Sequence, residues 1–192
     1  MDVVNNLEMI IPKMREQLYL KKVYSLDVLY QAIEKEGKYL KIKALDQFLA
    51  KFGIFLKSQE VTGLLNNCRH SETEIDLIRF IYLFRTEVPK DIIDTLNSIF
   101  LKISEGQSSM DVEEALLHLN VFQHPQLEMF QENAEKAKES VIRGLKLIIG
   151  DKKIILREEF IEFHFNIFWI MPEFQIAHFR RQLPLMWGIK KI

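Results

Sequence analysis

One pattern recurs four times along this chain of 192 residues. Each copy has an apolar stripe at helical spacing, a polar break, three residues of extended character and a second helical stripe. The breaks cover residues 34–44, 69–79, 104–114 and 149–159, so the copies follow one another at intervals of about 35 to 45 residues. A repeat of this length predicts one supersecondary unit used four times, which is stronger evidence than any single copy.

The stripes predict an all-α protein. In the first copy Leu26, Leu29, Tyr30 and Ile33 occupy positions i, i+3, i+4 and i+7, which lie on one face of a helix. Gly and Pro number only 7 and 5, so few residues oppose helix formation.

Short extended pieces interrupt the helical pattern. They are Leu40-Lys41-Ile42, Ile75-Asp76-Leu77, Met110-Asp111-Val112 and Ile155-Leu156-Arg157. Because these pieces occupy the same place in each copy, we expect them to pair loop with loop as tiny two-stranded sheets.

Two lobes are expected, with two copies in each. The segment 85–91 separates the second copy from the third, and its Pro89 suits the first turn of a new helix. Residues 1–86 then form an N-terminal lobe. Residues 87–192 form a C-terminal lobe, which ends in an aromatic-rich tail helix.

Composition excludes several classes of function. A formal net charge of −1 provides no field that would attract nucleic acid or an anionic membrane. The single cysteine, Cys68, excludes an internal disulfide framework and a cysteine-cluster zinc site. The start of the chain lacks the regions of a secretory signal, and no apolar run approaches the roughly 18 residues of a membrane span. We therefore expect a cytoplasmic protein without a membrane span.

The sequence offers no catalytic constellation. No histidine stands in an HExxH motif or another metal-ligand spacing with a carboxylate. No nucleophile elbow is present, and the glycines stand singly rather than in a phosphate-binding loop. We expect neither an enzyme nor a cofactor. The histidines concerned are His70, His118, His124, His164 and His178.

The polar breaks resemble the calcium-binding loop of the EF-hand, which is a helix, a twelve-residue loop and a second helix. Oxygen ligands stand at loop positions 1, 3, 5 and 12, glycine at position 6 and an apolar residue at position 8. Between the flanking apolar residues Ile33 and Leu45, the first loop has eleven residues. The other three loops have the same length by the same choice of anchors, so each is one residue short.

Most of the oxygen ligands are missing as well. The first loop closes with Ala44 and the second with Arg79, whose cation replaces the carboxylate that calcium needs. The third loop keeps Glu114 and the fourth keeps Glu159, but Lys152 stands where the fourth loop needs an oxygen. We expect no calcium binding. The alternative is residual binding of a divalent ion at the third or fourth loop.

Three charged residues near the loops allow further interpretations. Glu34 and Glu36 are expected in the first loop, exposed to solvent. Arg79 is either an ion-pair partner for an acid of a neighbouring loop, such as Glu36 or Asp76, or a solvated side chain.

Several stretches carry a family resemblance. The connection between the lobes is YLFRTEVPKDII at residues 82–93, and His124-Pro125 follows the third loop within an insertion at about 120–137. The last copy contains Glu158-Glu159-Phe160-Ile161, and the tail continues as FRRQLPLMWGI at residues 179–189. In these stretches and in its layout the chain resembles calcyphosin, a family with four EF-hands.

The resemblance implies paired EF-hands and binding to other proteins. It does not carry over the calcium-sensor role of the family, because the loops of this chain have lost their ligands. Calcyphosin-like proteins with degenerate loops also occur as fixed parts of ciliary and flagellar axonemes. By analogy we expect a calcium-independent structural adaptor of axonemal doublet microtubules, with tubulin and other axonemal proteins as partners. The alternative is a residual calcium-binding regulatory protein.

The C-terminal region holds a high density of aromatic residues. These side chains either pack in the core of the second lobe or form an exposed patch that binds a partner. In a third interpretation, the tail helix fills the groove of its own lobe. The candidates for partner binding are Phe165, Phe168, Trp169, Phe174, Phe179, Met186 and Trp187.

Overall fold

The computed structural model describes residues 7–23, 26–84, 88–123, 133–168, 171 and 173–190. The chain divides into two compact units. Unit 1 comprises Met1–Thr86 together with Trp169–Pro172, and unit 2 comprises Glu87–Phe168 together with Glu173–Ile192.

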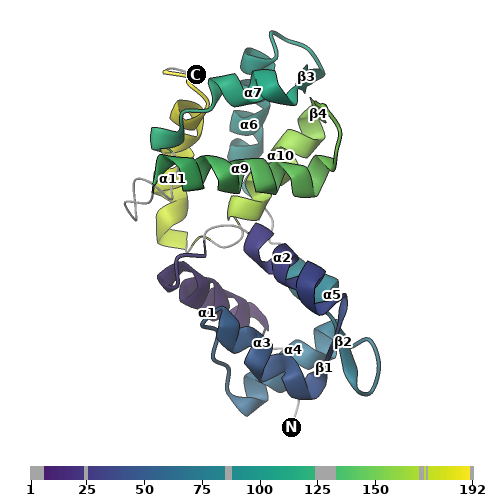
Figure 1. Cartoon of the computed structure of the whole chain (residues 1–192). Helices are drawn as coiled ribbons and strands as arrows, with labels where there is room; N and C mark the ends of the chain where they lie inside the picture. Colours follow the sequence, from purple (N-terminus) through teal and green to yellow (C-terminus); the bar gives the residue numbers. More distant parts are fainter. Residues whose placement is uncertain are drawn as a thin grey trace. The chain divides into compact units, whose positions relative to one another are not determined.

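Unit 1 consists of helices and one small sheet (Figure 1). The strands β1 and β2 pair antiparallel, with Leu40 opposite Ile75. In chain order the elements are α1 (Leu7–Leu20), α2 (Asp27–Glu36), β1 (Tyr39–Lys41), the 3-10 helix η1 (Ile42–Ala44), α3 (Leu45–Lys51), α4 (Ser58–Cys68), β2 (Glu74–Asp76) and α5 (Leu77–Tyr82).

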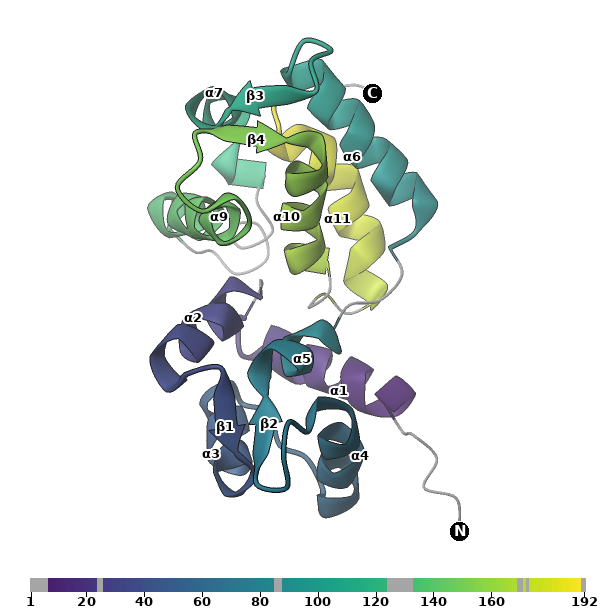
Figure 2. The same ribbon diagram turned by 90° about the vertical axis from the view of Figure 1, so that its right-hand side faces the viewer.

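Unit 2 has a sheet of the same kind, in which β3 lies beside β4 (Figure 2). The pairing is antiparallel and sets Met110 opposite Ile155. In chain order the elements are α6 (Lys90–Ile103), β3 (Ser109–Asp111), α7 (Val112–His118), the 3-10 helix η2 (Val121–Gln123), α9 (Ala134–Ile149), β4 (Ile154–Leu156), α10 (Arg157–Phe168) and α11 (Glu173–Met186).

These elements confirm the predicted helical class and the two tiny antiparallel sheets. The strand centres Leu40, Ile75, Met110 and Ile155 are all buried, as the apolar position of each repeat requires. Among the helices that the structure describes, none is long and apolar enough to cross a bilayer.

Each strand lies one residue earlier than the sequence pattern predicts. Strand β2 ends at Asp76 because this side chain caps the next helix. Its Oδ1 accepts hydrogen bonds from the amides of Ile78 and Arg79 at 2.8 and 3.2 Å, so α5 begins at Leu77. Asp111 caps α7 through the same pair of bonds. In all four copies the last residue of the predicted strand is the first residue of a helix, and in the second and third copies an aspartate cap accounts for this boundary.

Phenylalanine rings form the centre of unit 1. The buried ring of Phe80 meets Phe48 and Phe84 edge to face, with 6.2 and 5.5 Å between ring centroids. Helix α1 adds the fully buried side chains of Met14 and Leu18. Helices α1, α3 and α5 thus each contribute buried apolar side chains to unit 1.

Helix α10 packs against both α6 and α9 in unit 2. It approaches α9 closely because Gly144 lacks a side chain: a Cβ there would lie 2.9 Å from Cε2 of Phe163. On α10, Phe160 contacts Phe100 and Trp187, with 5.4 and 4.8 Å between centroids. Trp187 follows α11 directly, so the tail of the chain belongs to this core.

Candidate functional site

The first loop is shorter than the sequence indicates. Helix α2 continues to Glu36, so Glu34 and Glu36 are helical residues and not loop ligands. Gly37 ends the helix with a φ of 90°, a backbone conformation that favours glycine. The Glu36 carboxylate forms an ion pair with Lys51. Ala44, at the closing position, has no side-chain oxygen.

The guanidinium of Arg79 closes the second loop. Its Nη1 donates a hydrogen bond to the carbonyl oxygen of Arg69 at 3.4 Å, from one end of the loop to the other. The sequence anticipated an acid or solvent as the partner, and the structure adds this carbonyl. Asp76 is engaged by the first amides of α5 and by Lys38 at 3.6 Å. A cation of the chain itself thus lies at the closing position.

Lys152 neutralises the closing glutamate of the fourth loop. Its Nζ lies 2.9 Å from Oε1 of Glu159, and Oε2 accepts the amide of Leu156 at 2.9 Å. Partial burial alone would raise the pKa of Glu159, but the Leu156 amide and the Lys152 ammonium together lower this pKa below its ordinary value. The carboxylate is therefore ionised and already paired within the chain.

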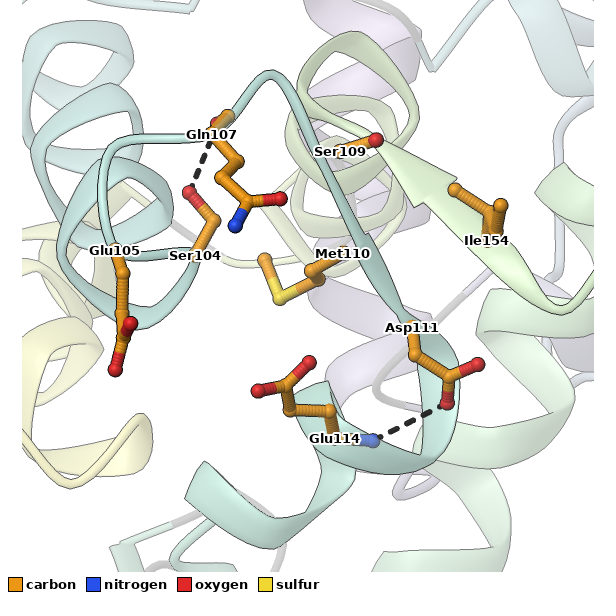
Figure 3. Close-up of a pocket in the computed structure, with 8 residues that line it drawn as sticks. All are labelled: Ser104, Glu105, Gln107, Ser109, Met110, Asp111, Glu114 and Ile154. Carbon is orange, nitrogen blue, oxygen red and sulfur yellow. Dashed lines mark hydrogen bonds between the residues drawn. The ribbon is translucent and has the colours of Figure 1, made fainter.

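A hollow of about 280 Å³ marks the third loop. Figure 3 shows the carboxylates of Glu105, Asp111 and Glu114 turned in different directions around it. The Asp111 carboxylate caps α7, and the Ser104 hydroxyl donates to the carbonyl of Gln107 at 2.9 Å. Two of the oxygen-bearing side chains are thus used within the loop itself. The hollow is lined by Ser104, Glu105, Gln107, Ser109, Met110, Asp111, Glu114 and Ile154.

Glu114 differs from its counterpart Glu159. The ion pairs between described residues include none with the Glu114 carboxylate, which faces the hollow. Throughout the described part of the chain, no three His, Cys, Asp or Glu side chains come together as a metal-binding group. Glu105, which also lines the hollow, likewise belongs to none of these ion pairs.

Most of the tail residues predicted to bind a partner are buried. Phe168, Phe179, Met186 and Trp187 have exposed fractions of 4%, 1%, 0% and 0%, so they offer no surface in this conformation. Phe165 is half-buried. Trp169 and the side chain of Phe174 lie outside the described residues, as does His124-Pro125. These four buried side chains follow the packing interpretation, because α11 covers the apolar face of its own unit.

A buried polar pair joins the tail to α10. The indole Nε1 of Trp187 donates a hydrogen bond to Nε2 of His164 at 2.8 Å, and Nδ1 of His164 lies 2.7 Å from the carbonyl oxygen of Phe160. Nε2 must be the acceptor for the indole, so Nδ1 carries the proton and donates to the carbonyl. The geometry thus specifies one tautomer of a neutral imidazole.

Sequence reasoning missed a cluster of cations in unit 1. A hollow of about 570 Å³, the basic hollow, is lined by Lys41, Ile42, Lys43, Arg69, Glu72 and Thr73. Its residues come from two segments that lie about 30 positions apart in the sequence. Strand pairing alone brings them together, so no local motif could have revealed them.

Some large apolar side chains of unit 2 are exposed. Leu117 on α7 is 86% exposed and Phe122 on η2 is 71% exposed. Burial of such side chains under another protein stabilises the complex, because apolar surface is removed from water.

No known protein family model matches this chain, and no curated protein matches its sequence.

Proposed function

We propose that this protein is a non-catalytic, calcium-independent structural adaptor built from four degenerate EF-hands in two paired lobes. Its role is to dock on other proteins in one permanent conformation. The observation that carries the proposal is the internal pairing of the loop ends, where Lys152 holds Glu159 and Arg79 holds the carbonyl of Arg69.

The pairing supports calcium independence through electrostatics. A calcium sensor without its ion holds several carboxylates close together, and their repulsion favours a change when the ion arrives. In the second and fourth loops, side-chain cations of this chain already occupy positions near the closing residue. These loops then have no further conformation for calcium to select.

Two features support docking on a protein partner. The exposed side chains of Leu117 and Phe122 provide apolar surface on unit 2. The formal net charge of −1 provides no overall positive field for nucleic acid, so a protein partner is favoured. The ciliary or flagellar axoneme, with tubulin among the partners, is the assembly suggested by the resemblance to calcyphosin, and it rests on that resemblance alone.

Fractionation of ciliated cells tests the adaptor function. The tagged chain should remain with detergent-extracted axonemes, and equally so in millimolar calcium and in a calcium chelator. The control is Glu114→Gln, which removes the closing carboxylate of the third loop and should not change retention. Complete release with the soluble proteins would contradict the axonemal assignment, and retention that depends on calcium would contradict the adaptor mechanism.

The alternative, a residual calcium-binding regulatory protein, is favoured by the third loop alone. Its closing carboxylate faces a hollow and belongs to none of the ion pairs between described residues. Binding there would be weak, because the aspartate and the serine of the same loop already serve as cap and loop closure.

A further inference from the structure

The basic hollow of unit 1 lies at the end of the sheet formed by β1 and β2. Pairing extends one residue beyond β1, because the amide of Ile42 donates to the carbonyl of Thr73 at 2.9 Å. Arg69 forms an isolated antiparallel bridge with Ile75, which returns the chain toward β2. These contacts place Lys41, Lys43 and Arg69 around one depression.

Positive charge dominates this depression. Its lining has three cations, Lys41, Lys43 and Arg69, and one carboxylate, Glu72. None of the three forms an ion pair with another described residue. Neighbouring lysines differ, since Lys38 is paired with Asp76 and Lys51 with Glu36.

The size and the lining favour a peptide ligand. About 570 Å³ lies within the range of roughly 300–1,000 Å³ that is typical of ligand pockets and exceeds the need of a single ion. The aliphatic stems of the lysines and the half-buried Ile42 add apolar surface beside the charges. Among the lining residues no aromatic ring is present on which a nucleic acid base could stack.

We propose that the basic hollow binds an extended, glutamate- or aspartate-rich segment of a partner protein. This inference rests on the adaptor function, because it takes the ligand to be a protein. Carboxylates of the segment would pair with the ammonium groups of Lys41 and Lys43 and, in bidentate fashion, with the guanidinium of Arg69. Such binding is weak per contact and decreases with salt, because all three cations are exposed.

Fluorescence anisotropy with the full chain tests this proposal. The probe is a labelled peptide of alternating Glu and Gly, and its comparison peptide has Gln in place of Glu. Lys41→Glu with Lys43→Glu should weaken binding of the acidic peptide about tenfold, which corresponds to about 1.4 kcal/mol. The matched control is Lys136→Glu with Lys138→Glu on α9, which changes the net charge equally at exposed positions of unit 2 and should change binding less than about twofold.

A second variant keeps the test valid if the double variant fails to fold. Lys43→Gln removes one charge outside the strands, so it should leave the melting temperature unchanged and reduce binding in the same direction. Equal binding of the Glu and Gln peptides, or equal losses in the two double variants, would overturn the proposal. Tighter binding of a mixed-sequence RNA at the same residues would assign the hollow to nucleic acid instead.

The axoneme fractionation distinguishes this proposal from the adaptor function. If wild type stays with axonemes but binds no acidic peptide, only the basic hollow is assigned wrongly. If wild type is released from axonemes yet binds the acidic peptide, the axonemal assignment fails and the hollow remains.

Discussion

Two regions of unit 2 differ in what they contribute to stability. One is the loop pair around β3 and β4, and the other is the tail formed by α11 and Trp187. The loops carry charged side chains at the surface, and their ion pairs are largely solvated. The tail carries aromatic side chains, of which Phe179 and Trp187 are buried. Burial of apolar area stabilises far more than an exposed ion pair does. The comparison therefore predicts that the tail holds unit 2 together and that the loops contribute little.

Removal of the Trp187 indole should reduce the stability of the folded protein more than any other substitution considered. Trp187→Ala deletes a fully buried ring that contacts Phe160 and leaves His164 without its donor. We expect a loss of about 3 to 5 kcal/mol in the free energy of unfolding, measured by denaturant titration. A loss of unfolding free energy smaller than that of the loop variants would mean that the loops, and not the tail, stabilise unit 2.

Trp187→Phe separates packing from hydrogen bonding. The phenyl ring keeps much of the apolar contact but cannot donate to Nε2 of the buried His164. A buried acceptor without a donor costs about 1 to 3 kcal/mol, so this variant should lie between Trp187→Ala and the loop variants. Equal stability of Trp187→Phe and wild type would show that the polar pair is incidental.

Glu159→Gln tests the internal cation of the fourth loop. We expect a loss of less than about 1 kcal/mol, because the Lys152 side chain is 63% exposed and solvent screens the pair. The folded-state pKa of Glu159 is lowered, so its contribution is present above the pKa of the unfolded chain. That contribution is lost as the pH falls through the lower, folded-state pKa.

Thermal unfolding over a pH series provides the measurement. The difference between wild type and Glu159→Gln should be visible near neutral pH and should vanish under acidic conditions, below the ordinary glutamate range. A difference that grows as the pH falls would mean that the carboxylate is not held in its ionised form.

Glu114→Gln should have the smallest effect on stability, within about 0.5 kcal/mol, because no ion pair with a described residue is lost. The same variant decides the calcium alternative. Calorimetry of wild type in millimolar calcium should give no saturable heat. A saturable heat that Glu114→Gln abolishes and Glu159→Gln preserves would establish a residual site in the third loop.

Much of the fold follows from local patterns. The repeated extended pieces that begin at Leu40, Ile75, Met110 and Ile155 predicted four short strands, and all four strands pair in two-stranded sheets. The one-residue displacement of each strand shows that local patterns do not fix the exact boundary between a strand and the next helix. Extended character and an N-cap look alike over three residues, and the bonds of Asp76 to the amides of α5 decide between them.

The candidate site was less predictable. Glu36 belongs to α2 because the helix ends only at Gly37, a boundary that an eleven-residue count between apolar anchors cannot place. The aromatic residues of the tail could have been core or surface, since both arrangements require large apolar side chains. The basic hollow requires strand pairing between distant segments and has no local signature.

By itself, the sequence determined the helical class and placed the short strands to within one residue, because periodicity is a local property. Only the tertiary structure decided which partners the charged side chains of the loops have and where the buried tail aromatics lie. The contacts from Lys152 to Glu159, from Arg79 to Arg69 and from Trp187 to His164 join residues that lie 7, 10 and 23 positions apart. Contacts between such residues depend on how the loops close and how the helices pack, which no local pattern specifies.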